Sequence, residues 1–128
     1  MWCTINEPAV YAFAGYLIGI HSPGNLAFTT DGFRMCGEVL KNLLSAHIEV
    51  YHTLKKLPGG DKAQIGIVHN VLKFKPRYSF EPISSLICTF FTSFTNDVTM
   101  NFLKTGQYEY EPFSMLWGNS LCAVTHYD

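Results

Sequence analysis

The sequence predicts an α/β fold with a parallel sheet, built from about two βα units. Short apolar runs suited to strands alternate with two long segments of helical periodicity. Strands and helices in alternation favour parallel strands joined by right-handed helical crossovers. The chain has 128 residues, 48% of them hydrophobic, so we expect one small domain with a genuine apolar core.

The first βα unit begins at the N-terminus. Trp2 to Ile5 is a short apolar run that suits the end of a strand, and Glu7 and Pro8 follow directly. Proline is favoured in the first turn of a helix, so Ala9 to Tyr16 is expected to form a short apolar helix. Glycines and a proline then predict a loop that lasts to about Thr30.

A long helix is predicted from about Thr30 to Lys56. Thr29, Thr30 and Asp31 are candidate N-cap residues, and Leu57-Pro58-Gly59-Gly60 ends the segment. Apolar residues recur every three or four positions, which predicts one continuous helical face. That face consists of Met35, Val39, Leu43, Ala46, Val50 and Leu54.

The second βα unit follows the same order. Gln64 to His69 is short and β-branched and suits a buried strand, and Lys73 to Pro82 is expected to be a loop. A second long helix is predicted from about Ile83 to Lys104, with Gly106 as its C-terminal glycine cap. Its apolar stripe, which we expect to pack against a sheet, consists of Leu86, Phe90, Phe94, Val98 and Phe102.

Composition excludes several classes of function. The net charge of −1 comes with no basic stripe, which argues against a nucleic-acid partner. Polar and acidic residues interrupt the longest apolar stretch, 83–103, so no membrane span is expected. The start of the chain has no basic region followed by an apolar run, and the four cysteines lie far apart. A cytoplasmic protein with reduced thiols is therefore expected.

Thr4-Ile5-Asn6-Glu7-Pro8 carries the most chemical information. In parallel α/β barrels, residues at the carboxyl end of a strand face the site where the chemistry takes place. A carboxylic acid placed there can protonate a departing oxygen, and an adjacent amide can hydrogen-bond a hydroxyl group of a sugar.

This stretch, followed by Gly15-Tyr16 and Ser22-Pro23-Gly24, resembles the T-x-N-E-P signature and the following loop of family 1 glycoside hydrolases. Gln64 to Ile67 is similar to the next strand of these enzymes. Phe102 to Tyr108 is similar to their helix-to-loop segment, with Glu109 in place of the usual proline. Three patterns in the right order make the resemblance specific.

The resemblance implies a sector of a (β/α)₈ TIM barrel that is incomplete as a barrel. Such a barrel typically needs about 250 residues. The resemblance covers residues 1–108, which we take as a partial family 1 barrel segment. Residues 109–128 form a divergent tail without a familiar pattern.

The resemblance also implies a retaining β-glycosidase mechanism, in which two carboxyl groups about 5–5.5 Å apart divide the work. Glu7 matches the acid/base residue, and Asn6 matches the neighbour that hydrogen-bonds the sugar 2-hydroxyl. The expected substrate is a β-glucoside, a 6-phospho-β-glucoside or a related carbohydrate.

The second carboxyl group has no counterpart in this chain. In the family the nucleophile lies in a T-E-N-G-like motif further along the sequence. None of the remaining glutamates has that context, so the isolated chain is expected to be inactive. These glutamates are Glu38, Glu49, Glu81, Glu109 and Glu111.

Simpler interpretations of these residues remain open. Glu7 is also compatible with an ordinary first-turn glutamate favoured by the helix dipole, and Asn6 with a helix cap. Asn70 follows the second strand and would face the same rim as Glu7, where it could contact substrate. It equally suits a residue that shapes a loop.

No metal site or cofactor is predicted. The five histidines lack ligand spacing; His47 and His52 are five residues apart, which does not align them on a helix. The alternative to a glycosidase fragment is a non-catalytic remnant that binds a sugar or a protein. Uncovered sheet edges would then favour self-association.

Overall fold

The computed structural model describes residues 1–78, 80–110 and 125–126. The chain divides into two compact units, Met1–His69 and Asn70–Asp128. No shift in composition marks this division, and the sequence did not predict it. The boundary expected at residue 108 separates residues that resemble a known family from a divergent tail. It does not refer to compact units, and it stays a prediction.

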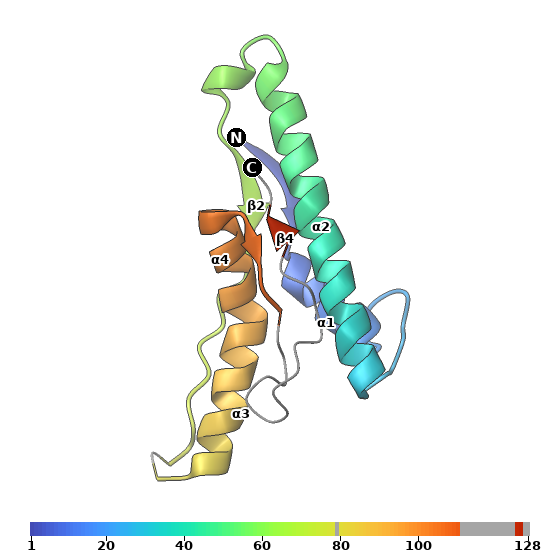
Figure 1. Cartoon of the computed structure of the whole chain (residues 1–128), viewed down its shortest axis with the longest axis vertical. Coiled ribbons are helices and arrows are strands. Elements are labelled where there is room, and N and C mark those ends of the chain that lie inside the picture. The colour runs from blue at the N-terminus through green and yellow to red at the C-terminus, as the bar shows by residue number, and fades with distance from the viewer. Residues whose placement is uncertain (79, 111–124, 127–128) are drawn as a thin grey trace. The chain divides into compact units, whose positions relative to one another are not determined.

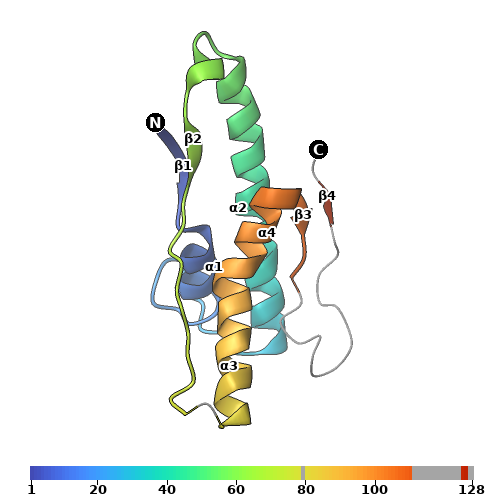
Figure 2. The same ribbon diagram turned by 90° about the vertical axis from the view of Figure 1, so that its left-hand side faces the viewer.

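The first unit contains two strands and two main helices. Strand β1 (Trp2–Asn6) is followed by helices α1 (Pro8–Tyr16) and α2 (Thr30–Lys56), the short 3-10 helix η1 (Gly60–Lys62) and strand β2 (Ile65–Val68). The two strands pair in parallel, and the long helix α2 lies beside them (Figures 1 and 2). The predicted order of strand, helices and strand is thus present in this unit, and each of these elements lies within a few residues of its expected bounds.

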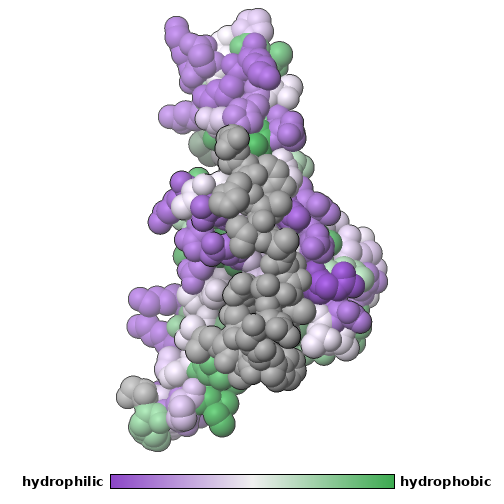
Figure 3. Space-filling view, viewed as in Figure 1, coloured by the Kyte–Doolittle hydropathy of each residue, from purple (hydrophilic) through white to green (hydrophobic). Residues whose placement is uncertain are grey.

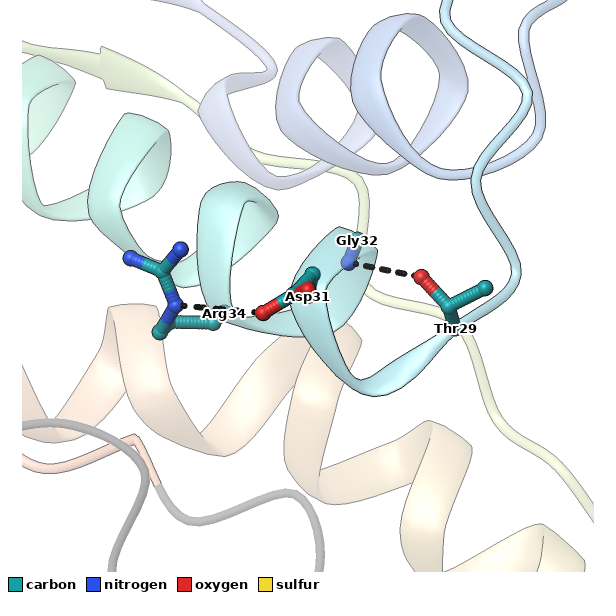
Figure 4. A network of polar contacts seen from close by, with 4 residues as sticks. All are labelled: Thr29, Asp31, Gly32 and Arg34. Carbon is teal, nitrogen blue, oxygen red and sulfur yellow. Dashed lines mark hydrogen bonds and ion pairs between the residues drawn. The ribbon is translucent and has the colours of Figure 1, made fainter.

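Local chemistry defines the start of α2. Thr29 has extended backbone, and its hydroxyl accepts a hydrogen bond of 3.2 Å from the Gly32 N–H (Figure 4). This contact satisfies one of the N–H groups that a helix start leaves without a partner. Arg34 and Asp31 form an exposed ion pair at 3.7 Å, which contributes little to stability.

The packing face of α2 differs from the predicted one. Residues Met35 and Val50 of the predicted face are 41% and 44% exposed, and Ala46 is also exposed. The buried face lies one residue further along the helix, about 100° around its axis. It consists of Gly32, Phe33, Cys36, Gly37, Leu40, Leu44 and His47.

Both faces have apolar spacing of three and four, so periodicity alone does not choose between them. Gly32 lacks a side chain, which allows the backbone of Ala27 to approach the buried face closely. Burial raises the pKa of the Cys36 thiol to about 12, so this cysteine stays neutral within the core.

The second unit is built around one continuous helical segment. Helix α3 (Pro82–Thr92), the π-helical turn η2 (Ser93–Asp97) and helix α4 (Val98–Thr105) follow without a break. Strand β3 (Gln107–Tyr108) then pairs antiparallel with β4 (Thr125–His126). The predicted helix over 83–104 is confirmed, as is its cap, because Gly106 has φ 71°. The short β3–β4 pair was not predicted.

The aromatic stripe of this helix forms the core of the second unit. Phe94, Val98 and Phe102 are buried, as are Tyr108 and Tyr110. The ring centroids of Phe94 and Tyr110 lie 5.7 Å apart, and those of Phe102 and Tyr108 lie 6.3 Å apart, in edge-to-face geometry. The second half of the stripe therefore packs against β3 and Tyr110, as expected for a helix on a strand. The first half differs from the prediction, because Leu86 is 37% exposed and α3 contains no buried residue.

The surface is uneven in polarity. The end of α2 and the neighbouring η1 appear as a hydrophilic region in Figure 3, whereas apolar residues gather near the start of α3. Phe80 and Ile83 in that region are 80% and 73% exposed. Within the residues that the structure describes, no helix has the length and apolar composition needed to cross a membrane.

Gly32 provides a test of the first unit. A Cβ added at Gly32 would lie 1.6 Å from the carbonyl oxygen of Ala27, so Gly32→Ala must displace backbone. We expect a loss of about 1–3 kcal/mol in the free energy of unfolding, measured by urea denaturation. Gly66→Ala is the matched control, because its Cβ would meet nothing within 4 Å. Equal stabilities of the two variants would contradict the packing described here.

Candidate active site

Glu7 lies at the carboxyl end of β1, directly before α1. Its backbone has φ 52° and ψ 60°, and it is the one non-glycine residue with positive φ among the described residues. The Glu7 N–H donates a 2.8 Å hydrogen bond to the Val68 carbonyl, and the Glu7 carbonyl accepts one of 3.0 Å from the Tyr11 N–H. The residue is half-buried.

This backbone conformation is strained for two reasons. The left-handed region costs an L-residue roughly 1–2 kcal/mol. In addition, a residue before proline prefers extended backbone, and Pro8 follows Glu7. Such residues persist where the surrounding structure over-determines them, which occurs most often at functional sites. The two hydrogen bonds and the buried ring of Pro8 provide that support.

Asn6 is the last residue of β1 and is exposed. The strand register changes just before it: Cys3 pairs with Gly66 and Asn6 pairs with Val68, so β1 contains one more residue than β2 between these pairs. This is a β-bulge. Because side chains alternate along a strand, an extra residue reverses the faces beyond it. Asn6 therefore does not share the face of Thr4, which is directed at α2.

Thr4 joins three elements at this bulge. Its hydroxyl donates to the Gly66 carbonyl of β2 at 3.2 Å and lies 2.7 Å from Nδ1 of His47 in α2. The direction of the Thr4–His47 hydrogen bond depends on the tautomer of the imidazole. With the Thr4 proton on Gly66, the His47 ring donates from Nδ1.

His47 is buried, with 6% of its surface exposed. Burial lowers the pKa of His47 below its ordinary value of 6.5, because an imidazolium loses solvation in the core. The ring also lies 6.1 Å from that of Tyr51, one turn further along α2. The sequence did not single out His47 or Thr4 for this role, although the threonine belongs to the T-x-N-E-P pattern.

Asn70 lies in the second unit, two residues after the end of β2, and is exposed. The segment after it is held by Asn96, a buried residue of η2 that sequence reasoning missed. The Asn96 side-chain amide donates to the Leu72 carbonyl at 2.6 Å, and its oxygen accepts from the Leu72 N–H at 3.0 Å. Asn96 thus pairs with backbone as a neighbouring strand would.

The described residues contain no group of three or more histidine, cysteine, aspartate or glutamate side chains that could hold a metal ion. A carboxyl group on a constrained backbone beside an exposed amide, at the carboxyl end of a parallel strand, is suited to proton transfer on a hydroxylated ligand.

Comparison with known proteins decides the family. A model of the family described as "Glycosyl hydrolase family 1" matches residues 1–125. The chain belongs to this family. The predicted resemblance is thereby confirmed, and the match continues beyond residue 108 into the C-terminal segment.

Several curated relatives of the chain are named β-glucosidases. The chain is 36% identical over 89 residues to "Beta-glucosidase 26, peroxisomal" of Arabidopsis thaliana, an alignment that covers 64% of this chain and 16% of that protein. It is 31% identical over 134 aligned residues to "Beta-glucosidase 14" of the same plant, covering 97% of this chain and 27% of that protein. The chain thus spans about a quarter or less of these relatives.

A solved structure confirms the fold class. The chain is similar to "Aphid myrosinase" with a TM-score of 0.63 and 19% identity, over 89% of this chain and 24% of that one. The chain therefore has the fold of a sector of a (β/α)₈ TIM barrel, and it is not a closed barrel.

The buried histidine predicts a pH dependence of stability. The unfolded chain binds a proton at His47 near pH 6.5, whereas the folded first unit binds it only at lower pH. The contribution of neutral His47 to the free energy of unfolding is thus fully present above pH 6.5. It is lost as the pH drops from there through the pKa of His47 in the folded state. Urea denaturation from pH 7.5 to 5 measures this change. His47→Asn should remove it, whereas His52→Asn, at an exposed position of α2, should not. A pH dependence that survives in His47→Asn would exclude this source.

Proposed function

We propose that this chain supplies the acid/base part of the active site of a retaining β-glycosidase that acts on β-glucosides. Glu7 is the proton donor, and Asn6 hydrogen-bonds the sugar. Asn70 is a further substrate contact. The observation that carries the proposal is the left-handed backbone of Glu7 at the carboxyl end of β1, in a chain of glycosyl hydrolase family 1. The names of the curated β-glucosidases support the substrate class.

The proposed reaction has two steps. First, a carboxylate attacks the anomeric carbon while the Glu7 carboxyl group gives its proton to the glycosidic oxygen, and the alcohol leaves. Next, the Glu7 carboxylate takes a proton from water, whose oxygen attacks the anomeric carbon and releases the carboxylate nucleophile. Asn6 would hydrogen-bond the 2-hydroxyl, a contact that strengthens in both transition states.

The attacking carboxylate is proposed to lie outside this chain. The other glutamates that the structure describes do not follow either of the two parallel strands. Glu38 and Glu49 belong to α2, Glu81 precedes α3 and Glu109 follows β3. Without the nucleophile, the covalent step has no acceptor for the glycosyl group, whatever the position of Glu7.

We predict that the isolated chain does not hydrolyse an aryl β-glucoside. The measurement is the absorbance of released nitrophenol, compared with the Glu7→Gln variant of the same chain. Both should match the rate of the buffer blank. Turnover by the unmodified chain that Glu7→Gln abolishes would show that the chain contains a complete catalytic pair.

A hybrid enzyme tests the role of Glu7 directly. The matching region of Beta-glucosidase 14 is replaced by this chain, since the two align over 97% of this chain. In the hybrid, Glu7→Gln should lower kcat/KM for an alkyl β-glucoside by roughly 10²–10⁴-fold, because general acid catalysis is lost. The loss should be smaller for a dinitrophenyl glucoside, whose leaving group needs no proton.

Azide provides the second part of this test. In a Glu7→Ala hybrid, azide should restore turnover of the dinitrophenyl substrate and yield a β-glucosyl azide, because azide attacks the intermediate without a general base. Glu49→Gln, at an exposed position of α2, is the matched control and should behave as the unmodified hybrid. A folded, active hybrid that is indifferent to Glu7→Gln would refute the proposal.

A further inference from the structure

Strand β1 contains a β-bulge that has no role in the proposed mechanism. It lies between Cys3 and Asn6, directly before the proposed acid/base residue. Bulges recur beside active sites, where they change the direction of a side chain. Without the extra residue, strict alternation would direct Asn6 to the same side as Thr4, toward α2.

The bulge also determines what Glu7 pairs with. With the extra residue, Asn6 lies opposite Val68 and the Glu7 N–H reaches the Val68 carbonyl at 2.8 Å. In an unbulged register, counting on from the Cys3–Gly66 pair, Ile5 would lie opposite Val68. Glu7 would then lie beyond the end of β2, and the hydrogen bond that supports its left-handed backbone would be lost.

A bulge interrupts the regular ladder of backbone hydrogen bonds. At this bulge the Thr4 hydroxyl lies 3.2 Å from the Gly66 carbonyl oxygen, to which it donates, and 2.7 Å from Nδ1 of the buried His47 ring. The two side chains thus join both strands to α2 at the irregular position.

We propose that Thr4 and His47 are positioning residues, which hold the β-bulge that directs Asn6 and Glu7 toward a substrate. This inference rests on the proposed function, since the direction of Glu7 matters only if it acts on a substrate. In this proposal Nδ1 of His47 carries the proton and donates to Thr4, and the ring touches no reacting atom. The hydrogen bond of His47 to Thr4, and not only the packing of the ring, is proposed to hold the bulge in place.

Amide hydrogen exchange of the full chain, followed by NMR, tests this proposal. The reporter is the Glu7 N–H, which bonds to Val68 beyond the bulge. The references are the Trp2 N–H, bonded to Gln64 before the bulge, and the Phe33 N–H, bonded to Thr29 at the start of α2. In His47→Leu the Glu7 amide should exchange about tenfold faster relative to both references, the effect of losing one hydrogen bond.

Two further variants separate the hydrogen bond from simple packing. The side-chain nitrogen of Asn lies near the position of imidazole Nδ1, whereas that of Gln lies closer to Nε2. His47→Asn should therefore restore slow exchange at Glu7, and His47→Gln should not. If Gln restores protection as well as Asn does, or if all three amides change equally in His47→Leu, the positioning role is wrong.

Thr4 gives an independent route if His47→Leu fails to fold. Thr4→Val keeps the shape of the side chain and removes its hydroxyl, while Thr4→Ser keeps the hydroxyl. Exchange at Glu7 should accelerate in Thr4→Val and stay unchanged in Thr4→Ser; equal exchange in both would overturn the proposal. Exchange reports on the bulge alone, and the Glu7→Gln hybrid reports on the chemistry, so failure of either idea is seen separately.

Discussion

The hydrogen bond from the Glu7 N–H to the Val68 carbonyl is the contact on which the candidate site depends. This hydrogen bond is the last one between the two parallel strands. The carbonyl of the same residue accepts a hydrogen bond from the Tyr11 N–H at the start of α1. A strand end and a helix start therefore share one residue. The left-handed backbone at Glu7 makes that sharp change of direction, and its cost is offset by the hydrogen bonds on either side.

Local signals explain why the elements could be predicted from the sequence. Pro8 at the start of α1, Thr29 before α2 and Gly106 after α4 act through backbone geometry and capping within a few residues. The buried face of α2 was predicted wrongly because two neighbouring stripes share the same spacing. The element that packs against the helix determines which stripe is buried, and the spacing of apolar residues along one helix does not reveal that element.

The candidate site divides in the same way. Glu7 and Asn6 lie within one short motif, so a family resemblance was enough to propose them. The hydrogen bond between Thr4 and His47 joins residues 43 apart in the sequence, and the bulge depends on the register with β2. Asn96 likewise contacts Leu72, 24 residues away. Contacts between residues so far apart in the sequence could not be predicted, because the residues near each partner give no sign of the other.

Belonging to a barrel family gives a physical reason for the surface of this sector. A two-stranded sheet has two outer edges, and Met35 and Val50 leave an apolar stripe of α2 exposed beside its buried face. In a (β/α)₈ barrel, neighbouring strands cover such edges and neighbouring helices cover such stripes. The bulge, the Thr4–His47 hydrogen bond and the strained Glu7 lie together within the first unit. The shape of the proposed acid/base region is thus determined by contacts within this unit.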